Sequence, residues 1–158
     1  MMTVDQTHNL LDRLASIPAR VARAVAGWSE ADLHTSSATD EWSAAAILAH
    51  LRASDDIITP RIYAMLVRDN PPLAAYDDRR WAEVARYEQA DFQTSLDLFT
   101  FRRAELVTML RRVPPADWQR AGLHETHGLI SILQVVTHLV EHEEEHCTQL
   151  EAIRPSFG

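Results

Sequence analysis

The chain has 158 residues, of which 46% are hydrophobic and 24% are charged, proportions typical of one soluble domain with a core of its own. The net charge of −8 argues against nucleic acid as the main partner, because phosphate contacts need a basic surface. With only four glycines and seven prolines, and no apolar run approaching the ~18 residues of a membrane span, the composition favours helix over sheet and excludes a transmembrane protein.

The cysteine content and the N-terminal residues indicate a cytoplasmic protein. Cys147 is the only cysteine, so the chain can form no internal disulfide, as is usual in a reducing compartment. The first residues carry an acidic side chain early and lack a basic start followed by an apolar run, so they do not predict a signal peptide. We expect residues 1–158 to form a single domain in the cytoplasm.

The first predicted helix covers residues 3–26, where apolar residues recur at three- and four-residue spacing. Pro18 should kink this helix or divide it in two, and Gly27 should end it. The polar residues 28–42 follow and are typical of a connection built from turn-forming residues.

The second predicted helix follows Ser43, which can cap it, and ends near Pro71. His50 lies on its apolar face, with apolar neighbours one turn away on either side. Such a histidine is usually a hydrogen-bonded core residue, but next to a pair of histidines it becomes the best candidate for a third metal ligand. Asp55 follows within two turns, and Pro60 should kink the helix.

Residues 73–89 read as a loop followed by a short helix, whose aromatic side chains either pack a crossover against the bundle or line a pocket mouth. The third long helix covers 91–112, and Pro114 stops it. The connection that follows contains His124 and His127, which we expect to be solvated loop histidines with a minor chance of reaching a metal site. No alternating pattern predicts a strand.

The last predicted helix, 131–153, carries three histidines at four-residue spacing. Ser131 can cap it, with Gln134 completing a capping box. Side chains four residues apart stack on one helical face. His142 and His146 lie inside the apolar stripe and His138 lies on its margin, whereas Cys147 lies well round the helix and should only pack. The stripe consists of Ile132, Val135, Leu139, Leu150 and Ile153.

Two imidazoles one turn apart can bind one metal ion at about 2.0–2.1 Å. The alternative is a pair of core histidines with ordinary hydrogen-bond partners. His138 and His146 are about 12 Å apart along the helix axis, so all three histidines of this helix cannot share one ion. A third ligand must come from elsewhere in the chain.

The segment His142–His146 satisfies the H-E-x-x-H pattern of zinc proteases. In a helix this rich in glutamate, however, such a match arises easily by chance. The extension to a third downstream histidine fails because position 149 is Gln149. Glu143 stands at the edge of the apolar stripe. It could act as a base, hydrogen-bond a ligand imidazole, or be a rim carboxylate in water.

Four long amphipathic helices with longer crossover connections predict an all-α four-helix bundle, a fold that places metal sites between facing helices. Four groups of motifs follow one another along the chain: Glu41-Trp42-Ser43 leading to His50-Leu51, Arg102-Arg103-Ala104-Glu105-Leu106, Asp117-Trp118-Gln119-Arg120 with Gly122, His124 and Gly128, and His142-x3-His146 with Gln149-Leu150. In their order and spacing they resemble the DinB-like (YfiT-like) metalloprotein family along nearly the whole length of the chain.

This resemblance implies one divalent metal ion, zinc or nickel, held by His50, His142 and His146. It also implies a small-molecule substrate, with members that act as thiol-dependent S-transferases using bacillithiol or mycothiol, others named metal-dependent hydrolases, and frequent homodimers. The family often has an acidic residue where this chain has Ala53, which shifts attention to Asp55.

Two readings of the function follow. In the first, the chain is an enzyme in which Glu143 or Asp55 accepts a proton. In the second, it is a non-catalytic bundle with satisfied core histidines or a structural metal that Glu143 or His138 completes.

Overall fold

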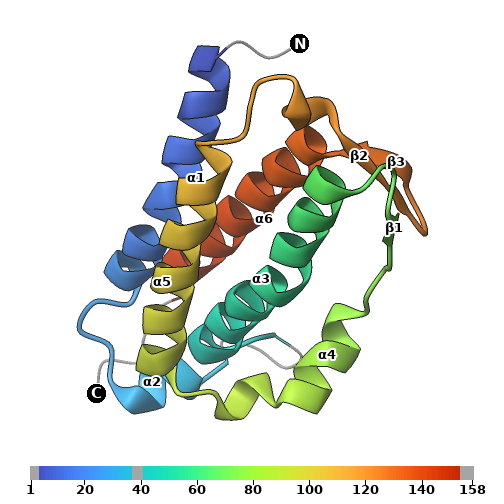
Figure 1. The fold of residues 1–158 in the computed structure, drawn as a ribbon. Coiled ribbons are helices and arrows are strands. Elements are labelled where there is room, and N and C mark those ends of the chain that lie inside the picture. The colour runs from blue at the N-terminus through green and yellow to red at the C-terminus, as the bar shows by residue number, and fades with distance from the viewer. Residues whose placement is uncertain (1–3, 37–40, 154–158) are drawn as a thin grey trace.

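The computed structural model describes residues 4–36 and 41–153 and shows a four-helix bundle (Figure 1). Its long helices are α1 (Val4–Ala24), α3 (Ala44–Val67), α5 (Phe92–Leu110) and α6 (Ile132–Ala152). The predicted all-α bundle is therefore confirmed, with helix ends within about four residues of those expected. Thr3, at the start of the first predicted helix, lies outside the described residues.

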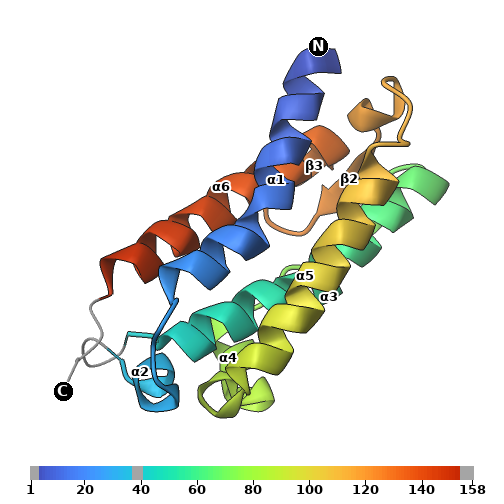
Figure 2. The same ribbon diagram turned by 90° about the vertical axis from the view of Figure 1, so that its left-hand side faces the viewer.

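One of the connections between the four helices is a long crossover, which runs from α3 to α5, as expected for this class of bundle. In Figure 1 the colours show α3 and α5 running in the same direction, opposite to α1 and α6. Helix α1 packs on α5 and α6, and α3 packs on the same two helices (Figure 2). The crossover between α3 and α5 contains the predicted short helix, α4 (Asp78–Ala85), followed by a 3-10 turn at Tyr87–Gln89.

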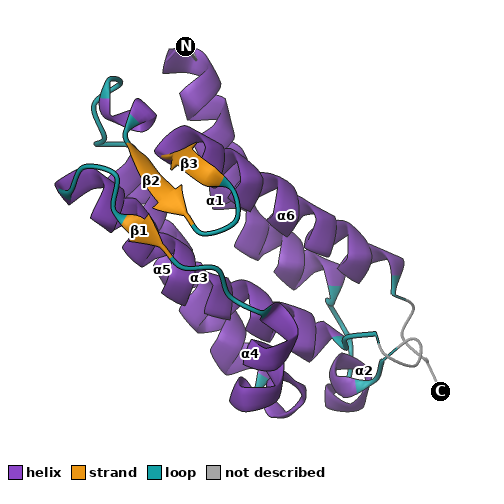
Figure 3. Cartoon of the chain, turned by 90° about the vertical axis from the view of Figure 1, so that its right-hand side faces the viewer, coloured by secondary structure: helices purple, strands orange, loops and turns teal. Residues whose placement is uncertain are grey.

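A small sheet lies at one side of the bundle, where no strand was predicted (Figure 3). Strand β2 (Ala121–His124) pairs antiparallel with β3 (Gly128–Ser131) and parallel with β1 (Pro72–Leu73). Two to four residues are too few to show an alternating pattern. A β-carbon on Gly122 would lie only 2.7 Å from Leu73 Cδ1, so this glycine lets the crossover pack against the hairpin.

Helix α1 continues through Pro18, so the division considered for the first helix does not occur, and α3 likewise continues through Pro60. The connection 28–42 contains a short helix, α2 (Glu30–His34), whose capping box joins Ser29 and Asp32. None of the helices in the described part of the chain is long and apolar enough to cross a membrane.

A buried ion cluster ties three of the long helices together. Arg103 of α5 donates from Nη2 to Asp55 Oδ1 of α3 at 3.0 Å and to Glu143 Oε1 of α6. The Arg103 side chain is 1% exposed and those of Asp55 and Glu143 are 2% and 0% exposed. Such a cluster is retained only when the charges pair, because an isolated buried charge costs several kcal/mol.

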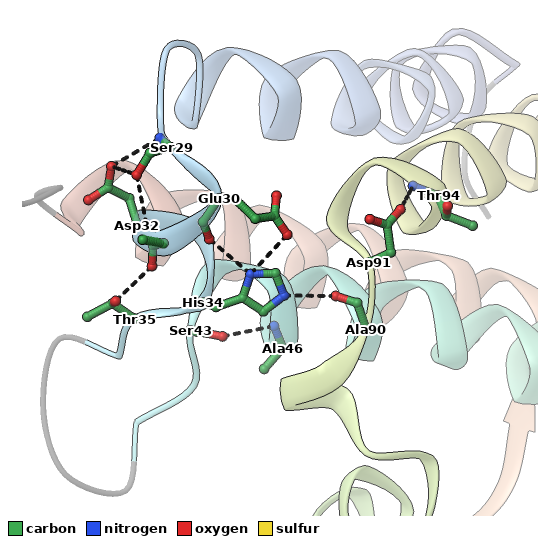
Figure 4. A network of polar contacts seen from close by, with 11 residues as sticks. Ser29, Glu30, Asp32, His34, Thr35, Ser43, Ala46, Ala90, Asp91 and Thr94 are labelled. Atoms are coloured by element: carbon green, nitrogen blue, oxygen red, sulfur yellow. Dashed lines mark hydrogen bonds and ion pairs between the residues drawn. The ribbon is translucent and has the colours of Figure 1, made fainter.

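A second polar network holds α2 against the start of α5 (Figure 4). The His34 ring contacts the carbonyl oxygen of Glu30 at 3.0 Å and that of Ala90 at 3.1 Å. Carbonyl oxygens only accept, so both ring nitrogens must donate and the imidazolium form fits best. The hydrogen bond to Glu30 accordingly raises the pKa of His34.

We predict that Arg103→Met lowers the free energy of unfolding by about 3–5 kcal/mol, because it leaves two carboxyl groups buried without their partner. The control is Arg102→Met, one residue earlier. Arg102 pairs with Asp56 across a 38%/42% exposed ion pair, so its loss should cost less than about 1 kcal/mol. Urea unfolding of both variants checks this, and equal losses would contradict the assigned role of Arg103.

We further predict that His34 stabilises the fold in acid more than in base. A raised folded pKa gives stability that is fully present below the ordinary value of about 6.5 and is lost as the pH rises through the folded pKa. The difference in melting temperature between the wild type and His34→Gln should therefore shrink with rising pH. A difference that stays constant between pH 5.5 and 9 would show that His34 is not bound as the cation.

Candidate metal centre

Three histidines from two helices converge on one point between α3 and α6. His142 Nε2 lies 3.1 Å from His50 Nε2 and 3.2 Å from His146 Nε2, and one nitrogen from each ring lies within 4.8 Å of the other two. The spacing of four residues places His142 and His146 on the same face of α6. The antiparallel packing of α3 brings His50 opposite them.

The geometry and the electrostatics both fit a single divalent ion. Ligand bonds of about 2.0–2.1 Å at 90–110° separate the donor atoms by about 2.8–3.4 Å, which includes the two observed distances. Burial, the largest influence, lowers the pKa of His50 to about 3 and that of His142 to about 4. The rings are therefore neutral at physiological pH, as metal ligands must be.

Neighbouring side chains fix the orientation of the ligand rings. His146 Nδ1 lies 3.0 Å from Gln149 Oε1, an acceptor, so Nδ1 carries the proton and Nε2 is free to bind metal. The Trp42 ring stacks on His146 with 19° between planes and lies 4.9 Å from the His50 ring centre. This role of Gln149 was not predicted from the sequence, although its position about one turn after His146 places the two side chains on the same helical face.

The ligand set leaves room for water or substrate. Among the described residues, no fourth histidine, cysteine or carboxylate joins the cluster. A cavity of about 630 Å³ reaches His142 from the side of the sheet, and the exposed side chains of His138 and His127 on its lining connect it to solvent. Its volume lies within the range of about 300–1,000 Å³ of small-molecule sites. Catalytic metal sites keep such an open position.

The structure places Glu143 and Asp55, the expected proton acceptors, around Arg103 instead of in the cavity. Neither is among the described residues that line the cavity. Glu143 is 0% exposed, so the rim carboxylate considered from the sequence is wrong. Burial, the largest influence, raises the pKa of Glu143 and of Asp55.

Sequence analysis also missed Arg103, although a signal was present. Arg103 lies between Phe99 and Leu106 on the buried stripe of α5, and a charged residue in such a stripe needs a partner.

The positions of His138 and Cys147 agree with the expectations from the sequence, and that of His124 does not. His124, His127 and His138 all line the cavity; His124 is buried, so it is not the solvated loop residue that was expected. His138 is not part of the three-histidine cluster, as the helix geometry required. Cys147 is fully buried in the apolar core and packs there, as expected.

The sequence and fold match known proteins over most of the chain. A sequence profile of the DinB superfamily matches residues 13–150. The Bacillus subtilis protein named "Putative metal-dependent hydrolase YfiT" is 22% identical over 98% of this chain and 87% of its own. A similarly named hydrolase of Oceanobacillus iheyensis is 23% identical over 90% of this chain and 83% of its own.

Solved structures agree with this fold. The YfiT structure superposes with a TM-score of 0.87 at 23% identity, over 95% of this chain and 88% of the other. A mycothiol-dependent maleylpyruvate isomerase superposes with a TM-score of 0.74 at 14% identity, over 97% of this chain and 65% of the other. The second protein is therefore longer than the bundle that the two share.

We predict that the purified protein carries about one divalent ion per chain and that His50→Ala loses it, because two imidazoles from one helix bind too weakly alone. His138→Ala is the control, since His138 lies one turn from His142 on the same helix outside the cluster. Elemental analysis measures the ion, and an excess of about 100 times the dissociation constant should raise the melting temperature by about 5–10 °C. An ion retained by His50→Ala would require a different third ligand.

Proposed function

The chain belongs to the DinB superfamily, and from this premise we propose that it is a metal-dependent enzyme with His50, His142 and His146 as the ligands. The observation that carries the proposal is the cavity that reaches His142 and is open to solvent. A structural metal would need a closed ligand set, whereas the described residues offer three ligands. The volume of the cavity fits a small-molecule substrate.

We propose zinc or nickel as the ion, because neutral imidazoles suit both metals. Three neutral ligands leave the 2+ charge uncompensated, so the ion would make a coordinated water or thiol more acidic. Trp42 and Tyr87 cover His50 on the side of α4. They leave the cavity as the approach for the substrate.

We propose Asp78 as the proton acceptor of the site. It is the only carboxylate among the described residues that line the cavity, and it lies beside the Tyr76 hydroxyl. Its negative charge is a minor influence that raises the pKa of His146. Asp78 is the first residue of α4, and it belongs to the part of the crossover that lines the cavity.

Glu143 and Asp55 then take a different part from the one expected from the sequence. Glu143 follows His142 directly and Asp55 lies just over one turn after His50, so their bonds to Arg103 fix the two ligand-bearing helices relative to α5. We propose that both are positioning residues. Fixed ligands hold a metal centre better than mobile ones, because less order is lost on binding.

Hydrolysis is the reaction that we propose first. The curated relatives are named as metal-dependent hydrolases, and an acidified water with an adjacent carboxylate suits the attack on an ester or amide. A thiol-dependent transfer is the second candidate. It is favoured by the shared fold with the mycothiol-dependent isomerase and by a cavity large enough for a thiol beside its electrophile.

We predict that the metal-loaded protein hydrolyses p-nitrophenyl esters and that Asp78→Asn lowers kcat by about 100-fold or more, as expected for loss of a general base. Glu83→Gln is the control, since Glu83 lies on the same helix, pairs with Arg80 and is 65% exposed. The Glu143→Gln variant should have a lower free energy of unfolding than the wild type while its kcat changes less than that of Asp78→Asn. Steady-state kinetics and urea unfolding measure the two effects.

The same preparation tests the second candidate and the non-catalytic alternative. Bacillithiol, mycothiol and glutathione are each offered with 1-chloro-2,4-dinitrobenzene, and conversion is compared with that by His146→Ala. Turnover of thiol but not ester assigns the transferase reaction. If the metal-loaded wild type converts neither class faster than His146→Ala, the metal is structural and the enzyme proposal is wrong.

A further inference from the structure

The cavity above the metal centre is walled by two facing rows of side chains. Residues 50, 54, 58 and 61 follow the helical repeat along one face of α3, and residues 134, 138 and 142 do the same on α6. Because α3 and α6 run in opposite directions (Figure 1), His50 faces the end of α6 that carries His142 and His146, and Arg61 faces its beginning. The eight helical steps from Gln134 to His142 span about 12 Å.

The end of the cavity away from the metal is built for a negative group. Arg61 lines the cavity, donates from Nη2 to the Ala74 carbonyl oxygen and lies over the Tyr76 ring at 5.8 Å. The contacts with the crossover hold its guanidinium in place. In the described part of the chain, Arg61 takes part in no ion pair within 4.0 Å, and burial lowers its pKa.

His124 adds a second donor beside this arginine. Its Nδ1 accepts the backbone N–H of Thr126 at 3.2 Å, so the ring proton of the neutral form lies on Nε2. Arg61 and His127 both lower the pKa of His124 after the larger effect of burial, which keeps the ring neutral and Nε2 a donor. The side chain is buried and lines the cavity.

The acidic groups near Arg61 do not fill this position. The Glu125 carboxylate accepts the backbone N–H of Ala75 at 2.7 Å, and Glu125 is not among the described residues of the cavity lining. Asp78 lines the cavity beside the Tyr76 hydroxyl, and within the described residues it forms no ion pair with Arg61. Apolar side chains from Ile58, Val135 and Leu139 lie between the two ends.

We propose that this cavity takes a substrate that carries a carboxylate, with Arg61 and the Nε2–H of His124 binding the carboxylate and an apolar segment leading to the reacting group at His142. The proposal rests on the proposed function, because it uses the open metal position for the other end of the same molecule. The proposed class of substrate is therefore a carboxylic acid with a short apolar chain or ring. The hairpin and the crossover, which supply His124 and the support of Arg61, become the specificity elements.

The test uses two thiols that differ only at the far end, 8-mercaptooctanoate and 8-mercaptooctan-1-ol, with cobalt(II)-loaded protein. Thiolate bound to cobalt gives a charge-transfer band, so the metal reports binding without any turnover. The carboxylate should bind about 10- to 100-fold more tightly than the alcohol, as expected for a charge-assisted hydrogen bond. Arg61→Gln should abolish this ratio, whereas Arg68→Gln should keep it, because Arg68 is exposed at the end of α3.

The outcomes separate this inference from the proposed function. Equal binding of both thiols, or a ratio that survives Arg61→Gln, overturns the carboxylate site and leaves the open metal position standing. If neither thiol changes the cobalt spectrum, the open position is wrong. The carboxylate site is then decided by calorimetric titration of metal-free protein with octanoate and octanamide, where a preference for octanoate that Arg61→Gln removes supports it and equal binding rejects it.

Discussion

The pairing of Arg103 with two buried carboxyl groups is the constraint on which the rest of the site depends. One buried cation, Arg103, faces the buried carboxyl groups of Asp55 and Glu143, so ionising both carboxyl groups would leave one negative charge uncompensated. Burial raises the pKa of Glu143, and a proton held there makes the cluster neutral. A neutral, bonded cluster can remain in the core, and it joins α3, α5 and α6 at one level of the bundle.

Because of this pairing, the buried acidic residues Asp55 and Glu143 contact Arg103 and do not line the cavity. The two carboxyl groups expected from the sequence to serve the metal centre, Asp55 and Glu143, are bonded to Arg103 instead. The ion would therefore be held by neutral rings alone and keep its full charge for a water, a thiol or a substrate group. The acid that remains available, Asp78, comes from the crossover and not from a helix that carries the clustered histidines.

The sequence predicted the four helices and the three converging histidines because both follow from helical periodicity. His142 and His146 are one turn apart on one helix, and His50 interrupts an apolar stripe on another. What the helical wheel of α6 could not show is that this helix has two buried sides. It packs on both α1 and α3, so Val136, Val140, Glu143 and Cys147 form a second buried row, and Glu143 looked like a rim residue only because one neighbour was assumed.

The groups that sequence analysis missed depend on tertiary contacts that no local pattern encodes. Arg61 reaches the cavity because the crossover passes beside it at Ala74, and His124 becomes buried because its strand pairs with both β1 and β3. These short elements carry few residues and little pattern. Helix periodicity thus accounts for the three clustered histidines, whereas pairing between segments about 50 residues apart accounts for the lining of the cavity.

This division places the two parts of the proposed activity on different parts of the fold. The ligand histidines lie on rigid helices that Arg103 fixes, where small shifts would weaken metal binding. The donors and the acid that face the substrate come largely from the hairpin and the crossover, which loop changes can alter without repacking the bundle core. Arg61 is the exception, since it lies on α3 but is held by the crossover. A chain with the same three histidines and a different crossover would therefore keep the metal and change its substrate.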